Sequence, residues 1–145
     1  MGILGIGVDI LHVPRLVSLI ERRTDKRVAA RILSNQEFAV WETLPSSDHV
    51  RRTRFLAVRW CIKEAAYKAI YPLARPTWKD LTFHGLQAGK NDTKPTLEYR
   101  FTSSSPALGK IHVSVSHDGD YVFTAVLVED PPTHATSAQF CHHTR

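Results

Sequence analysis

Two acidic residues and one lysine have the types and spacing that metal-assisted chemistry needs. Asp9 lies near the end of an otherwise apolar segment, residues 3–10, where an unpaired carboxylate would be costly to bury. Glu64 and Lys68 lie four residues apart, so on a helix their side chains would be neighbours. Carboxylates from two elements form a minimal ligand set for Mg²⁺, which takes its other ligands from water and substrate phosphates. The pattern therefore indicates metal-assisted chemistry on a phosphoanhydride or a phosphodiester.

Each of these residues also has a purely structural interpretation. Asp9 could cap the helix that follows it. Glu64 and Lys68 could form a surface salt bridge, and their spacing alone favours this over a catalytic role. Both interpretations stay open when the residues are considered one at a time.

Positive charge is concentrated in residues 11–70, which contain 12 Lys or Arg and six Asp or Glu. The rest of the chain contains seven and eight, so this segment accounts for the net charge of +5. A basic surface of this kind suits nucleic acid, anionic lipid, a phosphorylated small molecule or an acidic protein. Equally, these positive charges could lie on a solvated helix face that binds no partner.

The length and composition of the chain limit what can position these residues. Its 145 residues and 16.4 kDa suit one domain. No apolar run approaches the ~20 residues of a membrane span, and the N-terminus lacks a signal-peptide layout. The two cysteines, Cys61 and Cys141, are too few for a disulfide framework and lack zinc-site spacing. We therefore expect a soluble intracellular domain with no membrane partner.

Three helices are expected in the first half of the chain. Pro14 suits the first turn of a helix that runs to about Arg23. Ser34 and Glu37 match a capping box at the start of a second helix, which ends before Pro45. The strongest helical pattern covers about residues 51–70, where apolar residues form a stripe that no Gly or Pro interrupts.

The second half of the chain predicts strands. Together with the N-terminal segment, the expected strands cover residues 3–10, 81–86, 96–101, 110–116 and 121–128. Asp118 and Gly119 predict a tight turn, so the last two strands form a hairpin. His112, Ser114 and Ser116 lie on the polar face of strand 110–116. We expect a domain of residues 1–129 and a disordered tail of residues 130–145, because the tail has few apolar residues.

Three blocks of sequence resemble a known family. The first is Gly5-Ile6-Gly7-Val8-Asp9-Ile10, the second covers residues 55–69 and contains Trp60-Cys61-Ile62-Lys63-Glu64-Ala65, and the third is His112-Val113-Ser114-Val115-Ser116-His117. In this order they resemble the holo-acyl-carrier-protein synthase family of 4'-phosphopantetheinyl transferases, nearly continuously over residues 3–129. The compact length resembles the small, trimer-forming branch. Trp60 is reminiscent of the transferase domains of fungal fatty acid synthases, so a stand-alone fungal enzyme is one expectation.

The resemblance implies an α+β fold in which a long helix packs on an antiparallel sheet. It implies transfer of 4'-phosphopantetheine from coenzyme A to a serine of apo acyl carrier protein, with release of 3',5'-ADP. Asp9 and Glu64 would bind Mg²⁺, with Mn²⁺ as an alternative, and Lys68 would reach the same phosphates. Glu64 and a metal-bound water are both candidate acceptors of the serine proton.

The resemblance also implies that Arg59, Lys68 and His112 contact coenzyme A, with Ser114 and Ser116 as weaker candidates. Arg59 precedes Glu64 by five residues, so it points about 140° away around a helix that turns ~100° per residue. The family places each site between two protomers of a homotrimer, so one chain can offer its two helix faces to different sites. The alternative for His112 is a structural role, in which its ring forms hydrogen bonds within the sheet and contacts no ligand.

The basic first helix is expected to dock the carrier protein, because carrier proteins are acidic around their modified serine. Arg15 and Arg22 share one face of this helix, with Leu16 or Leu19 at the edge of the contact. The chain departs from the family at residues 71–76 and 93–95, which border the expected nucleotide site and leave the metal pair unchanged.

The sequence alone leaves two other functions and two cellular compartments open. The first alternative is a basic module that binds nucleic acid through residues 11–70, with salt-dependent affinity. The second is a Mg²⁺-dependent pyrophosphohydrolase that uses water in place of serine. Neither explains the three sequence blocks, so we expect no nucleic-acid partner. The mitochondrial matrix and the cytoplasm are both compatible with the sequence.

Overall fold

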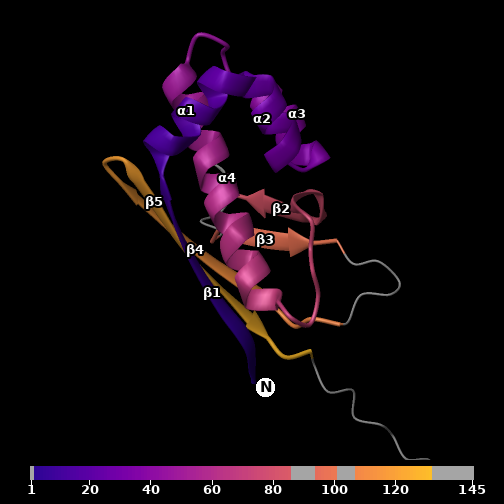
Figure 1. Ribbon diagram of the computed structural model, residues 1–145. Helices are drawn as coiled ribbons and strands as arrows, with labels where there is room; N and C mark the ends of the chain where they lie inside the picture. Colours follow the sequence, from indigo (N-terminus) through magenta and orange to yellow (C-terminus); the bar gives the residue numbers. More distant parts are fainter. Residues whose placement is uncertain (1, 86–93, 101–106, 132–145) are drawn as a thin grey trace, which may run out of the picture.

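The computed structural model describes residues 2–85, 94–100 and 107–131, which contain an antiparallel sheet (Figure 1). Its strands are β1 (Ile3–His12), β2 (Leu81–His84), β3 (Thr96–Tyr99), β4 (Ile111–Asp118) and β5 (Tyr121–Glu129). Their spatial order in the five-stranded sheet is β1-β5-β4-β3-β2, and every neighbouring pair is antiparallel. The N-terminal strand therefore lies at one edge and pairs with the last strand.

Helices cover one face of this sheet. They are α1 (Val13–Arg23), α2 (Asp25–Ile32), α3 (Asn35–Glu42) and α4 (His49–Ile70), followed by the short 3₁₀ helix η1 (Trp78–Asp80). The long helix α4 crosses β1 and β5, while α1, α2 and α3 gather around its N-terminal half (Figure 1). The expected α+β class, with a long helix packed on an antiparallel sheet, is confirmed.

Helix α4 packs unusually close to β1 because β1 has glycine on the face that meets the helix. A Cβ atom at Gly5 would overlap the carbonyl oxygen of Ala69, and one at Gly7 would overlap that of Ala65. The helix in turn presents small, fully buried alanines to the strand. This close approach brings Asp9, two residues after Gly7, next to the middle of α4.

Most of the expected elements are present with small shifts at their ends. Helix α4 begins at His49, two residues before the expected start, because the Asp48 side chain accepts a hydrogen bond from the Arg51 backbone N–H at 3.0 Å. The capping box of α3 forms as expected, since Ser34 N–H donates to Glu37 Oε2 at 2.8 Å. Gly119 has φ 51° in the expected β4–β5 turn, a region that favours glycine.

Helix α2 was not among the expected elements. Thr24, with φ 72°, ends α1 and separates it from α2. Val28, Ala29 and Ile32 anchor this short helix in the core. The expected strand ends at Leu86 and Phe101, and residues 132–145 of the expected tail, lie outside the described residues.

The opposite face of the sheet has no helix over it in the part of the chain that the structure describes, and it is largely apolar. Ile6, Val8 and Ile10 on β1 and Tyr121 and Phe123 on β5 have exposed fractions between 47% and 62%. The structure contains no helix, among its described residues, that is long and apolar enough to cross a membrane.

Candidate active site

The structure brings Asp9, Glu64 and Lys68 together at the contact between β1 and α4. The Lys68 ammonium donates to Asp9 Oδ1 and to the Val8 carbonyl oxygen, both at 2.9 Å. The salt bridge that spacing favoured between Glu64 and Lys68 is therefore replaced by an ion pair with Asp9. Asp9 does not cap α1 either, because His12 holds the N-cap position without a side-chain bond.

Asp9 and Glu64 line the same cleft, which has a volume of about 490 Å³. Helix α1 forms its other wall with Arg15, Ser18 and Arg22, so two carboxylates face a basic helix. This arrangement can hold a cation between the carboxylates and an anionic ligand against the arginines.

Glu64 has a specific hydrogen-bond partner. The indole N–H of Trp78, in η1, donates to Glu64 Oε1 at 3.0 Å. Trp78 also packs at a tilt against Trp60, with 5.3 Å between the ring centroids. Trp60 lines the same cleft as Glu64, so these two aromatic side chains form part of the surroundings of the carboxylate.

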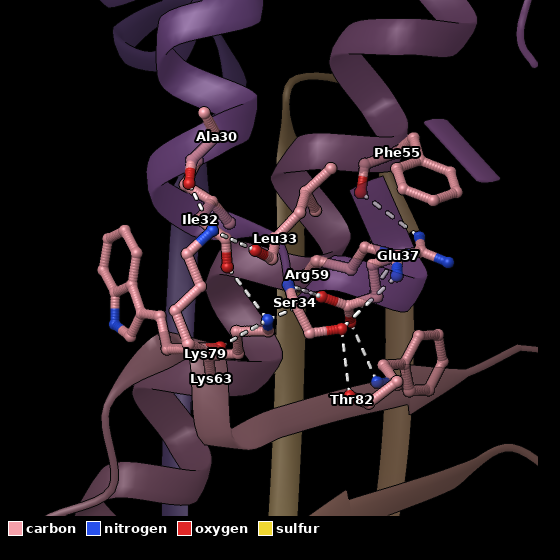
Figure 2. A network of polar contacts seen from close by, with 12 residues as sticks. Ala30, Ile32, Leu33, Ser34, Glu37, Phe55, Arg59, Lys63, Lys79 and Thr82 are labelled. Atoms are coloured by element: carbon pink, nitrogen blue, oxygen red, sulfur yellow. Dashed lines mark hydrogen bonds and ion pairs between the residues drawn. The ribbon is translucent and has the colours of Figure 1, made fainter. Parts of the chain in front are cut away.

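A buried polar network lies behind the cleft (Figure 2). Lys63 is completely buried, and its ammonium donates to Glu37 Oε2 at 2.6 Å, to the Trp78 carbonyl at 2.7 Å and to the Ile32 carbonyl at 2.9 Å. Glu37 also accepts hydrogen bonds from Ser34 N–H and Phe83 N–H. The network therefore ties α2, α3, α4, η1 and β2 together.

Burial governs the protonation of the two basic side chains in this network. It lowers the pKa of Lys63 below its ordinary value, and the nearby Glu37 carboxylate opposes this effect. Burial likewise lowers the pKa of Arg59 to about 10, again opposed by Glu37. Both shifts follow from the cost of removing a positive charge from water.

Arg59 lies away from Glu64, as its position on the helix predicts. Its Nε lies 3.8 Å from Glu37 Oε1, and its guanidinium lies over the Phe55 ring at 3.2 Å from the centroid. It also lines a separate open cleft of about 420 Å³ together with Arg54 and Phe55. Within one chain, the structure therefore does not bring Arg59 to the cleft of Asp9 and Glu64.

His112, Ser114 and Ser116 lie on the uncovered face of the sheet. Their neighbours Ile111, Val113 and Val115 pack into the core, so the three polar side chains point the other way. His112 Nε2 lies 2.7 Å from Glu129 Oε1 on this face. These residues are thus separated from the Asp9–Glu64 cleft of the same chain by the sheet.

The residues expected to dock a carrier protein lie on the wall of the cleft. Arg15, Leu19 and Arg22 all line it, and Leu19 and Arg22 continue into a second groove of about 510 Å³. Leu16 is only 1% exposed and belongs to the core, which leaves Leu19 as the apolar candidate. The second groove adds arginines that the sequence analysis did not single out: Arg23, Arg27 and Arg31.

Trp78, the hydrogen-bond partner of Glu64, is also a site residue that sequence reasoning missed. It comes 14 residues after Glu64, beyond a loop whose path no periodic pattern predicts. The only local signal is the pair Thr77 and Asp80, which form a capping box around it. That pair indicates a turn but not its contact with Glu64.

The donor set of the cleft suits a hard divalent cation. Among the residues that the structure describes, no third His, Cys, Asp or Glu joins Asp9 and Glu64 in a metal-binding cluster. Two carboxylates fit Mg²⁺, which keeps several water ligands and binds substrate phosphates. They do not provide the four protein ligands of a structural zinc site.

Comparison with known proteins agrees with this fold. The family model of the 4'-phosphopantetheinyl transferase superfamily matches residues 5–126, so the chain belongs to that superfamily. The holo-[acyl-carrier-protein] synthase of Klebsiella pneumoniae subsp. pneumoniae is 34% identical over 134 residues, which cover 89% of this chain and 99% of that protein.

Solved structures of similar proteins have the same overall fold. A holo-(acyl-carrier-protein) synthase from Bacillus anthracis, in complex with CoA (3',5'-ADP), is 26% identical, with a TM-score of 0.66 and coverage of 90% of this chain and 99% of that one. The holo-[acyl-carrier-protein] synthase of Neisseria meningitidis is 25% identical, with a TM-score of 0.69 and coverage of 88% and 99%. The chain is therefore similar to these enzymes over nearly its whole described length.

Proposed function

We propose that this protein transfers 4'-phosphopantetheine from coenzyme A to a serine hydroxyl of an apo acyl carrier protein. The observation that carries the proposal is the cleft in which Asp9 and Glu64 face the basic helix α1. The similarity to holo-acyl-carrier-protein synthases supports the same assignment.

The reaction is a displacement at the phosphorus that carries pantetheine. The serine oxygen forms a new bond to this phosphorus, and the bond from the phosphorus to the bridging oxygen of the pyrophosphate breaks. The products are the phosphopantetheinyl serine and 3',5'-ADP, which keeps the bridging oxygen. The serine proton passes to a base in the cleft, and either Glu64 or a water molecule can accept it.

Asp9 and Glu64 would hold Mg²⁺, or Mn²⁺ in its place, in this cleft. Bound there, the ion would supply charge neutralisation for the pyrophosphate and for the leaving 3',5'-ADP. Lys68 supplies a second positive charge at the same place, because its ammonium already lies 2.9 Å from Asp9 Oδ1. Its side chain is 53% exposed, and its long aliphatic stem would let the ammonium turn toward a substrate phosphate.

A homotrimer would complete the coenzyme A site. The exposed apolar face formed by β1 and β5 needs a partner, because apolar patches of this kind are unusual on monomers. His112, Ser114 and Ser116 lie on that same face, so association through it would carry them toward a neighbouring chain. Arg59, on the other side of α4 from Glu64, would serve a coenzyme A molecule bound between two chains.

The acidic carrier protein would dock on α1. Arg15, Leu19 and Arg22 border the cleft, so a carrier bound there would present its serine beside Asp9 and Glu64. The second groove extends this positive surface to Arg27 and Arg31 on α2. Complementary charge would speed the encounter and orient the acidic partner.

The nucleic-acid alternative loses support because part of the basic segment points inward. Arg52 pairs with Asp25 at 3.1 Å and lies over Trp41, and Lys63 belongs to the buried network. These charges are not available to a phosphate backbone.

The proposed domain of residues 1–129 includes every described helix and strand. The bacterial relatives give no support for a mitochondrial location.

Release of 3',5'-ADP from coenzyme A and Mg²⁺, measured with and without apo carrier protein, tests the proposal against the hydrolase alternative. A transferase releases 3',5'-ADP only when the carrier is present, in one-to-one ratio with modified carrier. Release at the same rate without carrier would contradict the proposal and identify a pyrophosphohydrolase.

A further inference from the structure

We propose that Trp78 is a positioning residue that fixes the Glu64 carboxylate for metal binding. The inference rests on the proposed function of Glu64 as a metal ligand and adds a residue that acts through it. The observation that carries it is the hydrogen bond from the Trp78 indole N–H to Glu64 Oε1 at 3.0 Å.

The hydrogen bond restricts a side chain that would otherwise be mobile. A glutamate on a half-exposed helix surface has several rotamers and a broad terminal torsion, so its oxygens sample many positions. The indole N–H is a donor only, so it binds a carboxylate oxygen and cannot compete for a cation. It engages Oε1 and leaves Oε2 as the second oxygen for a metal ion.

Trp78 can act in this way because its own backbone is held in place. Its carbonyl oxygen accepts a hydrogen bond from the completely buried Lys63 ammonium at 2.7 Å. On either side of it, Thr77 and Asp80 close the short η1 turn, with Thr77 N–H donating to Asp80 Oδ2 at 2.8 Å. The indole therefore extends from a fixed turn rather than from a free loop.

The same arrangement explains why a lysine precedes the glutamate in the helix. Consecutive residues point ~100° apart around α4, so Lys63 points into the core while Glu64 points into the cleft. Trp78 contacts both of them, through its backbone to Lys63 and through its side chain to Glu64. Lys63 is in turn held by Glu37 at 2.6 Å, so the buried network supports the position of the carboxylate.

Partners that orient a metal ligand in this way have measurable effects. Their loss commonly costs about 10- to 100-fold in metal affinity or activity. A residue with only a packing role would instead lower stability and leave metal affinity unchanged. Metal affinity and stability therefore separate the two roles of Trp78.

The test compares Trp78→Phe with Trp41→Phe in the full-length protein. Phenylalanine keeps an aromatic ring but removes the indole N–H. Trp41 is a matched control, because its buried indole nitrogen has no hydrogen-bond partner in the structure and it lies outside the cleft. A site-specific benzothienyl analogue of tryptophan at position 78, with sulfur in place of N–H, serves as a second variant if Trp78→Phe does not fold.

Two measurements on these variants do not depend on transferase activity. In the NMR spectrum, the indole N–H signal of Trp78 is assigned as the one that Trp78→Phe removes. Glu64→Gln should shift this signal and leave the indole signal of Trp41 in place. In Mn²⁺ titrations followed by EPR, Trp78→Phe should lower affinity about tenfold, whereas Trp41→Phe should stay within about twofold of the wild type. The kcat of Trp78→Phe should fall about tenfold at saturating substrates, with KM values for coenzyme A and carrier nearly unchanged.

An indole signal of Trp78 that Glu64→Gln does not move would overturn the inference. So would wild-type Mn²⁺ affinity in folded Trp78→Phe or in the benzothienyl variant. A wild-type protein that modifies no carrier would contradict the proposed function instead, while the NMR shift still decides whether Trp78 positions Glu64.

Discussion

Lys68 pairs with Asp9 and leaves Glu64 to the neutral indole of Trp78, so the two carboxylates of the cleft have different partners. A cation held between the carboxylates would share Asp9 with Lys68 or displace the ammonium toward a substrate phosphate. The half-exposed lysine can make this change because its long aliphatic stem leaves the charged end in water. Glu64, by contrast, is held by a donor that cannot bind the phosphates.

The proposed docking of the carrier protein on the first helix leads to a prediction for Arg15. Arg15→Glu should raise the KM for the acidic carrier protein about tenfold, because it replaces an attractive charge by a repulsive one at the wall of the cleft. The KM for coenzyme A should change much less. Steady-state kinetics with each substrate varied in turn measures both values.

Arg100→Glu is the matched control for Arg15→Glu, because it makes the same charge change at an exposed position just after β3. It should leave both KM values near those of the wild type. Equal increases in the two KM values for Arg15→Glu would contradict the docking assignment.

The elements around the cleft are held together by one buried ion pair. Lys63 of α4 and Glu37 of α3 are both almost completely buried, and their side chains also bind backbone groups of α2, β2 and η1. Removal of one partner from a buried pair leaves an uncompensated charge, which commonly costs about 3–5 kcal/mol. The pair therefore links the stability of the helical end to the position of Trp78.

Glu37→Gln should lower the free energy of unfolding by about 3–5 kcal/mol at pH 7, because it leaves the Lys63 ammonium buried without its counter-charge. Without the carboxylate, the pKa of Lys63 should fall further below its ordinary 10.5. The folded variant then releases this proton at a lower pH than the unfolded chain. Its free energy of unfolding should therefore rise as the pH increases from that lowered pKa toward 10.5.

Urea unfolding at several pH values between 7 and 10 measures this effect. Glu42→Gln is the control, because Glu42 pairs with Lys26 at 3.3 Å on the surface, where ion pairs contribute about 0–1 kcal/mol. If Glu37→Gln cost no more than this control, the buried pair would not hold the elements together.

Local sequence patterns predicted the elements that contain periodic or capping signals. The Ser34–Glu37 capping box, the apolar stripe of α4 and the Asp118-Gly119 turn all correspond to structure. Helix α2 escaped prediction because it is eight residues long and its start depends on Thr24, whose positive φ is rare for a β-branched residue. Its position is set by tertiary packing of Val28 and Ile32.

The candidate site was partly predictable for a similar reason. Asp9, Glu64 and Lys68 stood out through residue type and spacing and through the family resemblance. The structure places Glu64 in the same cleft as Asp9, and Lys68 forms an ion pair with Asp9. The partner of Lys68 and the contact between Trp78 and Glu64 depend on how β1 and η1 pack against α4. Neither packing arrangement is encoded in a local pattern.

On the scale of the whole molecule, the uncovered apolar face and the position of His112 have a common explanation. A protein whose active site is shared between chains needs a surface through which each chain binds its neighbour. It also needs polar residues on that surface that contribute to the neighbour's active site. Ile6, Ile10 and Phe123 supply the apolar surface, and His112 lies on the same side of the sheet. The proposed homotrimer would use both features at once.

Phe123→Asp should dissociate the proposed trimer, because it places a charge in the middle of the apolar face. Size-exclusion chromatography with light scattering should give three times the 16.4 kDa chain mass for the wild type and the single-chain mass for the variant. Transfer activity should fall with the loss of assembly, while the circular dichroism spectrum stays that of a folded chain. An active, monomeric variant would contradict a site shared between chains.

The most direct test of the account is the intact mass of an apo acyl carrier protein after incubation with this protein, coenzyme A and Mg²⁺. We expect the carrier to gain the mass of one phosphopantetheine, and we expect Glu64→Gln or removal of the metal with a chelator to abolish the gain. A carrier that gains the same mass at the same rate with Glu64→Gln, or with the metal removed, would contradict the assignment of the Asp9–Glu64 cleft as the catalytic site.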